Sequence, residues 1–458
     1  MALNQPQPDS EVLAGEAGPV LIRAGAVCGF PGPGDCARPG GVVATGGRVV
    51  AAGPTAELER AHRGAVARVI DWPHRVVLPG MVNAHAHLQL TAIGPQPYTG
   101  DFISWVEMLR RHWPGDAPPF EKSPDETWFV AAVGAGARQS LDAGVEAVGD
   151  ITQFEREAQA RRDAGLDGIS FVELFGHGPP FDRAALARLE TRAEGFQPHA
   201  PYSAGPAVFA AAAASGRPVS CHLAETLDED AFVRGLGGPF LDLLRAPPTR
   251  WSDTFAGNYG HGQSPVRWME PYLRRARWLL AHCNYVDDDD LTLLAETGAS
   301  VAYCPVASEY FGHGGAASET AASGVAATGV AATGVAASEP VASGGGGGVG
   351  HRYREMLEAG INVCLGTDSI VCQPAGEPQP LGILPQMRRL YRRDRADPAL
   401  LLAMATTHGR RALGLDDTVR RLATVVFDPG DPVEPLVQVL RGDGRVGAVD
   451  LRALPADG

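Results

Sequence analysis

The chain has 458 residues, of which 45% are hydrophobic and 20% charged, a composition typical of a soluble globular protein. Its formal net charge of −14 argues against nucleic acid or an anionic membrane as a partner, because both bind basic surfaces. No stretch approaches the ~20 uninterrupted apolar residues of a membrane span. Residues 1–18 lack the basic and apolar regions of a secretory signal.

The seven cysteines are odd in number and irregular in spacing, and four of them lie within apolar, strand-like runs. This usage predicts reduced, buried thiols in a cytoplasmic protein. The paired Cys-x-x-Cys spacing of a zinc ribbon is absent. The expected partner is a small-molecule substrate, and a homo-oligomer is left open.

Short apolar runs separated by glycine and proline occur in the first 77 residues and again in the tail. They are Val20–Val27, Gly41–Ala52, Val66–Ile70, Thr424–Phe427 and Val446–Leu451. Runs of this kind predict the strands of a small β-sandwich. We therefore expect residues 1–77 and 420–458 to form one small domain together.

Between these segments, apolar or β-branched runs alternate with helical patterns such as Glu126–Ala143 and Asp287–Thr297, which is typical of repeated βα units. Eight strands are predicted: Gly80–His85, Val145–Asp150, Ile169–Leu174, Gly195–His199, Val219–His222, Trp278–His282, Ser300–Cys304 and Asn362–Gly366. Eight is the number that a closed (β/α)₈ TIM barrel needs. We expect that barrel, an α/β fold, over residues 78–419. The acidic run Asp287–Asp290 is expected to cap a helix, since carboxylates favour a helix N-terminus.

A low-complexity stretch of alanine, glycine and serine covers residues 314–350, between the seventh and eighth strands. Such a composition buries too little apolar area to offset the entropy lost on ordering. A disordered insertion is therefore expected, with a mobile lid over the catalytic face as the alternative.

Four histidines and one aspartate lie at the ends of four predicted strands. His85 and His87 are two residues apart, so in a strand both side chains project to the same face. His222, His282 and Asp368 end the fifth, sixth and eighth strands. A single strand-end histidine is usually structural, and Asp368 alone could cap a turn. Because barrel enzymes place their sites at these strand ends, the joint pattern predicts a metal site.

These segments resemble the amidohydrolase superfamily, specifically its cytosine-deaminase-related branch. The matching text is LPGMVNAHAHL at 78–88, PHAPYS at 198–203, HLAET at 222–226, AHC at 281–283 and LGTDS at 365–369. The resemblance implies a divalent metal, Zn²⁺ or Fe²⁺, bound by His85, His87, His222 and Asp368. It also implies that His282 contacts the reactive water.

The only lysine of the chain, Lys122, bears on the number of metal ions. Two-metal members of the superfamily bridge their ions with a carbamylated lysine at the end of the fourth strand. Lys122 lies between the first and second predicted strands, so it cannot occupy that place. A site for one metal ion is therefore expected.

Glu225 follows His222 by three residues and suggests the type of reaction. In deaminases of this branch the matching glutamate protonates a ring nitrogen, whereas the alternative is a glutamate on a helix surface. Asp368 would accept the proton of the water, and His282 would orient that water. The resemblance therefore implies hydrolytic deamination of an aminated aromatic ring.

Two further segments, Phe102–Val106 and Tyr310–His313, resemble those of aminodeoxyfutalosine deaminases. The expected substrate is 6-amino-6-deoxyfutalosine, an adenine nucleoside that carries a benzoate group on a menaquinone route. The candidate substrate-binding residues are His199, Glu173, Trp105 and Phe102. His199 could equally be structural, and aromatic residues at this spacing are often helix core.

Several alternatives remain open on the sequence. After the Cys-Pro of the seventh strand, Ala307-Ser308 replaces the polar pair that is usual in the family, so the substrate contacts there are not predicted. Other enzyme functions are deamination of another purine, a pyrimidine or an S-adenosylhomocysteine-type nucleoside, and dechlorination of a triazine. A metal-free binding or scaffold homologue is the alternative of another class.

Overall fold

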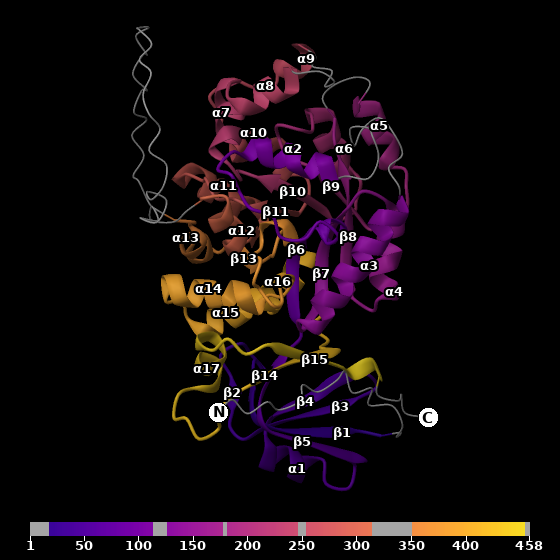
Figure 1. The fold of residues 1–458 in the computed structure, drawn as a ribbon, viewed down its shortest axis with the longest axis vertical. Helices are drawn as coiled ribbons and strands as arrows, with labels where there is room; N and C mark the ends of the chain where they lie inside the picture. The colour runs from indigo at the N-terminus through magenta and orange to yellow at the C-terminus, as the bar shows by residue number, and fades with distance from the viewer. Residues whose placement is uncertain (1–17, 113–125, 177–180, 246–252, 314–349, 454–458) are drawn as a thin grey trace.

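The computed structural model describes residues 18–112, 126–176, 181–245, 253–313 and 350–453. Over these residues the chain forms a parallel barrel and a second sheet built from both ends of the chain (Figure 1). Lys122 and residues 314–349 of the low-complexity insertion lie outside the described ranges, so the expectations for them remain predictions.

The eight barrel strands pair in parallel in chain order. They are β6 (Met81–Ala86), β7 (Val145–Thr152), β8 (Asp167–Leu174), β9 (Gly195–Pro198), β10 (Val219–Leu223), β11 (Trp278–His282), β12 (Ser300–Tyr303) and β13 (Asn362–Leu365). A parallel bridge between Ala86 and Asp368 connects the two ends of the sheet. There the backbone N–H groups of Thr367 and Asp368 each donate to the carbonyl of His85 at 3.0 Å. The barrel is confirmed, with strand ends within two residues of those predicted.

Helices surround the barrel and cover its mouth (Figure 1). They are α2 (Phe102–His112), α3 (Glu126–Asp142), α4 (Glu155–Asp163), α5 (Phe181–Arg188), α6 (Pro206–Ala214), α7 (Leu227–Gly235), α8 (Pro239–Arg245), α9 (Asp253–Ala256), α10 (Pro265–Leu273), α11 (Asp288–Thr297), α12 (Pro305–Tyr310), α13 (Tyr353–Glu358), α14 (Leu384–Asp394), α15 (Pro398–Ala405) and α16 (Thr407–Leu413), with short 3₁₀ turns η1 (Leu88–Leu90) and η2 (Ile370–Cys372). Asp287 caps α11 as expected, because its Oδ1 accepts from the Asp290 N–H at 2.8 Å. Within the described part of the chain, no helix has the length and apolarity to cross a membrane.

Both ends of the chain contribute strands to the second sheet, which has the order β15-β14-β5-β1-β3-β4, with β2 paired to β1. Its strands are β1 (Val20–Cys28), β2 (Cys36–Ala37), β3 (Gly40–Thr45), β4 (Arg48–Pro54), β5 (Arg68–Pro79), β14 (Arg421–Val426) and β15 (Val446–Asp450), accompanied by α1 (Thr55–Ala61), α17 (Pro435–Arg441) and η3 (Leu451–Ala453). The tail joins the N-terminal strands as predicted, since β14 pairs antiparallel with β5. The described strands form one seven-stranded sheet rather than two facing sheets.

The segment expected as one strand over Gly41–Ala52 is a hairpin of β3 and β4. Gly46 and Gly47, with φ of +55° and +72°, form its turn. Glycine adopts this left-handed backbone without steric cost, which allows a tight two-residue connection. The single-strand prediction was wrong because the apolar run continues on both sides of the turn.

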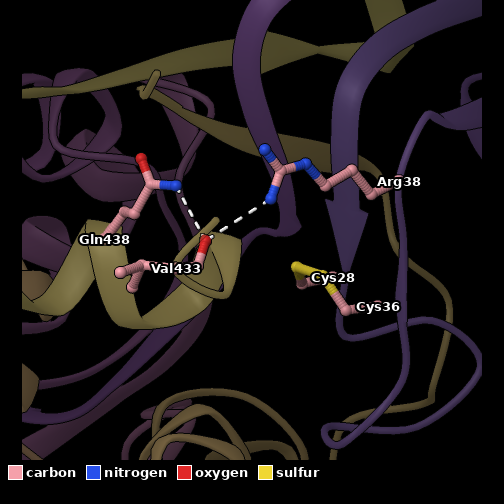
Figure 2. Close-up of a disulfide and its surroundings, with 5 residues drawn as sticks. All are labelled: Cys28, Cys36, Arg38, Val433 and Gln438. Carbon is pink, nitrogen blue, oxygen red and sulfur yellow. Dashed lines mark hydrogen bonds between the residues drawn. A yellow bond between two sulfur atoms is a disulfide. The ribbon is translucent and has the colours of Figure 1, made fainter. Parts of the chain in front are cut away.

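The cysteine prediction was wrong at two positions, because Cys28 and Cys36 form a disulfide (Figure 2). Cys28 ends β1 and Cys36 begins β2, and the antiparallel register of these strands places them opposite each other. Their spacing of eight residues carries no recognisable signature. The other five cysteines are free and buried, as expected. Beside the disulfide, the carbonyl of Val433 accepts from Arg38 and Gln438, which links the N- and C-terminal segments.

Candidate metal centre and active site

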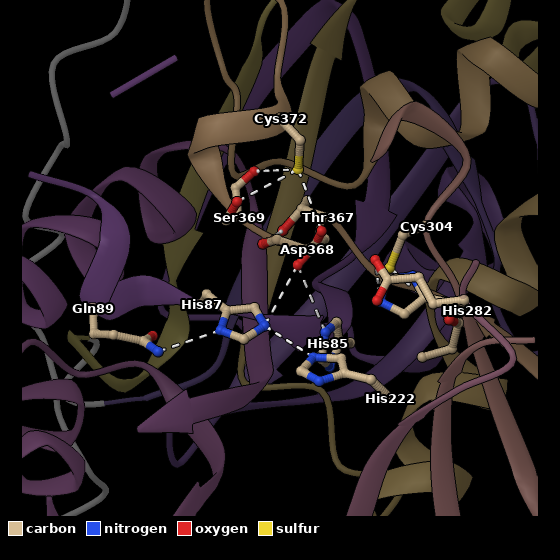
Figure 3. Close-up of polar contacts among 12 residues, drawn as sticks. His85, His87, Gln89, His222, His282, Cys304, Thr367, Asp368, Ser369 and Cys372 are labelled. Atoms are coloured by element: carbon tan, nitrogen blue, oxygen red, sulfur yellow. Dashed lines mark hydrogen bonds and ion pairs between the residues drawn. The ribbon is translucent and has the colours of Figure 1, made fainter. Parts of the chain in front are cut away.

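Five predicted residues converge at the C-terminal end of the barrel (Figure 3). His85 lies in β6 and His87 directly after it, while His222 and His282 come from β10 and β11, and Asp368 follows β13. His87 Nε2 and His222 Nε2 are 3.1 Å apart. Asp368 Oδ1 lies 3.5 Å from His87 Nε2 and 3.8 Å from His85 Nε2. The sequence therefore brings together ring nitrogens and a carboxylate within the reach of one ion.

The histidines of this cluster are buried, and burial lowers the pKa of each imidazole. The pKa values of His85, His87 and His282 are lowered further by neighbouring histidines, so the neutral form, which is the ligand form, prevails. Neither ring nitrogen of His85 has a hydrogen-bond partner in the described residues. Buried polar atoms rarely stay unpaired, so this donor set fits a divalent ion.

Potential ligand atoms form three overlapping groups, in each of which all atoms lie within 4.8 Å of one another. Two share His85 and contain His222 with His282, or His87 with Asp368; the third contains Glu173, His199 and His222. Nitrogen and oxygen donors of this kind suit zinc or iron. Burial raises the pKa of Asp368 to about 6, and a hydrogen bond from the Cys372 thiol partly opposes that rise.

The backbone at the site adopts conformations that are costly for residues other than glycine. Ala224, His282, Cys283 and Asp368 all have positive φ, between +50° and +73°. Hydrogen bonds hold this geometry, since Cys283 N donates to Leu223 O at 2.9 Å. Such conformations cost about 1–3 kcal/mol each and cluster at functional sites. Here they turn the strand-end side chains toward a common centre.

Sequence reasoning missed the residues that hold Asp368 in place. Cys372 Sγ donates to Asp368 Oδ2 at 3.3 Å (Figure 3). Asn83 fixes the preceding residue, because its Nδ2 donates to Thr367 Oγ1 at 2.7 Å and its Oδ1 accepts from Thr367 N at 3.1 Å. Asn83 lies two residues before His85 within the matched motif, which was the available signal.

Glu225 does not lie on a helix surface, because its side chain is only 9% exposed. Its Oε1 is 3.7 Å from His282 Nε2. Burial raises the pKa of Glu225 well above its ordinary value, and the neighbouring carboxylates Asp368 and Glu229 raise it further. Both causes favour the protonated form of Glu225.

A second polar group lies beside the histidine cluster. His199 Nδ1 is within 2.5 Å of Ser203 Oγ, and His199 Nε2 is 3.8 Å from Glu173 Oε1. Gln153 Nε2 donates to Glu173 Oε2 at 2.7 Å. Burial raises the pKa of Glu173 to about 8, so this carboxyl can also donate at neutral pH. Sequence reasoning identified His199 and Glu173 but missed Gln153 and Ser203.

Gln197 on β9 was also missed, although its Nε2 lies 3.3 Å from His222 Nε2. It occupies the fourth barrel strand, the strand on which two-metal members of the resembled superfamily carry their bridging lysine. β9 contains no lysine. A glutamine cannot be carbamylated, which agrees with the expectation of one metal ion.

The histidine cluster and the polar group around His199 open into one pocket of about 190 Å³. Nine of the ten predicted site residues line it, and His85 contacts the other ligands from the barrel interior. The lining residues are His87, Gln89, Leu90, Phe102, Trp105, Val106, Leu109, Arg110, Gln153, Glu173, Phe175, His199, Tyr202, Ser203, His222, Glu225, Phe240, Leu243, Leu244, His282, Asp368 and Ser369. The polar residues come mainly from strand ends and the apolar ones mainly from α2 and α8.

Comparisons with known proteins match this architecture. A model of the amidohydrolase family matches residues 76–424. A 5-methylthioadenosine/S-adenosylhomocysteine deaminase of Symbiobacterium thermophilum is 31% identical over 312 residues, which cover 63% of each chain and so less than two thirds of that relative. An aminodeoxyfutalosine deaminase of Deinococcus radiodurans is 27% identical over 413 residues, 84% of each chain. The structure of Helicobacter pylori aminofutalosine deaminase aligns with a TM-score of 0.68 at 18% identity, covering 93% of this chain and 97% of that one.

Proposed function

The chain belongs to the amidohydrolase family, and from that membership we propose that it is a metal-dependent deaminase of adenine nucleosides. The observation that carries the proposal is the position of the buried Glu225, whose pKa is raised, beside His282 and the cluster of candidate metal ligands. A hydrolase that only activates water needs a base and a metal. A deaminase also needs an acid that protonates the ring, and Glu225 supplies it.

His85, His87, His222 and Asp368 would hold one divalent ion, Zn²⁺ or Fe²⁺. The unpaired ring nitrogens of His85 and the short separation of His87 and His222 support this assignment. The bound ion supplies the Lewis acidity that makes water nucleophilic at neutral pH. Gln89, within 3.3 Å of His87 Nδ1, orients that ring from its other side.

The two carboxyl groups divide the proton transfers. Glu225 protonates the ring nitrogen next to the amino-bearing carbon, which makes that carbon electrophilic. Asp368, with a pKa of about 6, is largely ionised at neutral pH and takes a proton from water as the water oxygen bonds to the carbon. The new hydroxyl then returns a proton to Glu225, Asp368 gives its proton to the amino group, and ammonia leaves. The product is the ring carbonyl compound.

6-Amino-6-deoxyfutalosine is the substrate we propose first. The 84% coverage shared with the relative named as aminodeoxyfutalosine deaminase supports it. An S-adenosylhomocysteine-type nucleoside is the second candidate, supported by the relative at 31% identity. Both are adenine nucleosides with an extended substituent, and both would direct the adenine amino group toward the same acid and base.

Ammonia release from a panel of compounds tests the proposal. Protein reconstituted with one equivalent of Zn²⁺ or Fe²⁺ is assayed with 6-amino-6-deoxyfutalosine, S-adenosylhomocysteine, 5′-methylthioadenosine, adenosine, cytosine and a chlorinated triazine. We expect ammonia from the adenine nucleosides, fastest from the first, and neither ammonia from cytosine nor chloride from the triazine. Ammonia from no adenine nucleoside would refute the proposal. Glu225→Gln is the matched variant, because it keeps the size of the side chain and removes the acid.

A further inference from the structure

Figure 1 shows α2 and α8 at the barrel mouth. Side chains of these two helices form an apolar wall of the pocket. On α2 and α8, residues at helical spacing of three and four line the same cavity, so one face of each helix is turned toward it. They are Phe102, Trp105, Val106 and Leu109 on α2, and Phe240, Leu243 and Leu244 on α8. The rings of Phe102 and Phe240 meet edge to face, with centroids 5.8 Å apart.

A continuous path of rings leads from the catalytic residues to this wall. His199 contacts Tyr202, with centroids 5.7 Å apart, and Tyr202 stacks on Phe240 at 3.9 Å. Phe240 in turn touches Phe102, and Phe102 lies 5.5 Å from Trp105. The pocket therefore changes from polar at the strand ends to apolar along α2. A ligand that fills it has a polar reacting end and an apolar extension.

Arg110 lines the same pocket, two turns of α2 beyond Phe102. It is the one lysine or arginine of this lining set. No hydrogen bond or ion pair joins its guanidinium to another residue in the described ranges. Burial lowers the pKa of Arg110, and Glu107 on the same helix only partly opposes this. An arginine next to apolar side chains and without an ion pair among the described residues is suited to bind an anionic ligand group in bidentate fashion.

The acidic groups of the pocket lie at the other end. Glu173, Glu225 and Asp368 line the part of the pocket that lies beside the histidine cluster. Arg110, on α2, can therefore attract an anionic end of a ligand away from these carboxyl groups. The adenine ring is then directed inward.

We propose that α2 and α8 form a specificity slot for an apolar, aromatic extension of the nucleoside, and that Arg110 binds a carboxylate at the end of that extension. The inference rests on the proposed deaminase function and narrows its substrate class. An aryl carboxylate fills the apolar slot and pairs with Arg110. A methylthio group fills less of the slot and makes no ion pair, and an amino-acid extension places an ammonium group between apolar walls.

Steady-state kinetics of Arg110 variants test the slot. The substrates are an adenine nucleoside carrying a benzoate group, its neutral methyl ester, and 5′-methylthioadenosine. For Arg110→Gln we expect KM for the benzoate compound to rise about tenfold or more, because one charge-assisted pair is lost, while kcat changes little. KM for the ester and for methylthioadenosine should stay within about twofold. The KM of Arg110→Lys for the benzoate compound should lie between the values for Arg110→Gln and for the wild type.

Arg111→Gln is the matched control, because Arg111 is the next residue on α2 and is exposed like Arg110, but it does not line the pocket. It should leave all three KM values unchanged. The proposed slot is refuted if Arg110→Gln raises KM equally for the benzoate compound and its methyl ester, or if it changes KM for neither. It is also refuted if the wild type does not have a lower KM for the benzoate compound than for the ester. If the wild type deaminates no adenine nucleoside, the proposed function itself fails, which is a distinguishable outcome.

Discussion

Asp368 is constrained by its burial, by its backbone conformation and by contacts of both carboxylate oxygens. It is buried at 6% exposure, has a positive φ of 58°, faces two histidines through Oδ1 and accepts the Cys372 thiol through Oδ2. The strained backbone turns the carboxylate toward the histidines, and the thiol fixes which oxygen remains available. The orientation of this side chain therefore requires a backbone conformation of higher energy at Asp368.

Asp368→Asn should abolish deamination and leave the fold intact. The amide is isosteric, so the packing stays, but it cannot accept a proton from water or carry the ligand charge. We expect turnover to fall by about 10³-fold or more, with an unchanged circular dichroism spectrum. Near-wild-type turnover would refute the assigned role. Asp416→Asn, at an exposed aspartate far along the chain, is the control and should keep full activity.

Asp150 makes stability depend on pH. It is fully buried on β7, its Oδ1 accepts from the Leu88 N–H at 3.1 Å, and its Oδ2 has no partner in the residues described. Burial raises its pKa from 3.8 to about 8, so the folded state keeps the proton. Because the pKa of Asp150 is higher in the folded than in the unfolded state, its full contribution to the free energy of unfolding is present below pH 4. That contribution decreases as the pH rises toward 8.

The free energy of unfolding of the wild type minus that of Asp150→Asn should therefore decrease as the pH rises. The decrease should reach up to about 1.4 kcal/mol per pH unit between pH 4 and 8. Asparagine is neutral throughout, so any constant packing effect of the substitution cancels from this slope. Urea unfolding at pH 5, 6, 7 and 8 measures it. A difference that is constant with pH would contradict the protonated state of Asp150.

At the scale of elements, a buried ion pair connects the barrel with the segment that leads to the terminal sheet. Arg410 of α16 donates to Glu146 Oε2 of β7 at 2.6 Å, and Glu146 Oε1 accepts from Arg420 N at 2.7 Å. The side chains are 6% and 2% exposed. Burial raises the pKa of Glu146 although Arg410 opposes the rise.

Arg410→Ala should lower the free energy of unfolding by about 3–5 kcal/mol, because it leaves a buried carboxyl group without its cation. Chemical denaturation measures the loss. The double variant Glu146→Gln/Arg410→Met should recover part of it, since both charges are then removed. Arg411→Ala, at the exposed neighbour, is the control. A loss below about 1 kcal/mol for Arg410→Ala would show that the pair does not stabilise the fold.

The barrel strands could be predicted because parallel strands covered on both sides are continuous apolar runs. β5 was predicted too short, as Val66–Ile70 instead of Arg68–Pro79, because Trp72-Pro73-His74 interrupts its apolar pattern. The turn at Gly46-Gly47 was missed because apolar residues lie on both sides of it, so the pattern predicts one strand instead of two. Apolar periodicity marks burial and does not report pairing, so strand partners and the Cys28–Cys36 disulfide remained hidden.

The convergence of the candidate metal ligands could be predicted because the strand ends of a barrel meet at one face, so sequence order alone brings His85, His222 and Asp368 together. The supporting residues could not be predicted in the same way. Asn83, Gln197 and Cys372 acquire their roles only from neighbours distant in sequence. Phe102 and Trp105 on α2 were predicted as substrate-binding candidates and line the pocket, whereas the α8 residues were not predicted, because they approach α2 only in the folded chain.

At the scale of the whole molecule, the metal-binding residues join separate parts of the chain. They come from β6, β10 and the segment after β13, the same region where Thr367 and Asp368 close the barrel onto His85. A bound ion would therefore stabilise the closed barrel as well as serve catalysis, because it binds the folded state alone. The proposed slot, the carboxyl groups of Glu173, Glu225 and Asp368, and the candidate metal ligands His87 and His222 line one pocket.

The most direct test is ammonia release by metal-stripped protein titrated with Zn²⁺ or Fe²⁺ in the presence of the best adenine nucleoside. Turnover should be absent without metal, rise linearly and reach a plateau at one equivalent per chain, while Asp368→Asn stays inactive at every ratio. Full turnover without metal, a plateau at two equivalents, or no ammonia at any ratio would contradict a mononuclear metal-dependent deaminase.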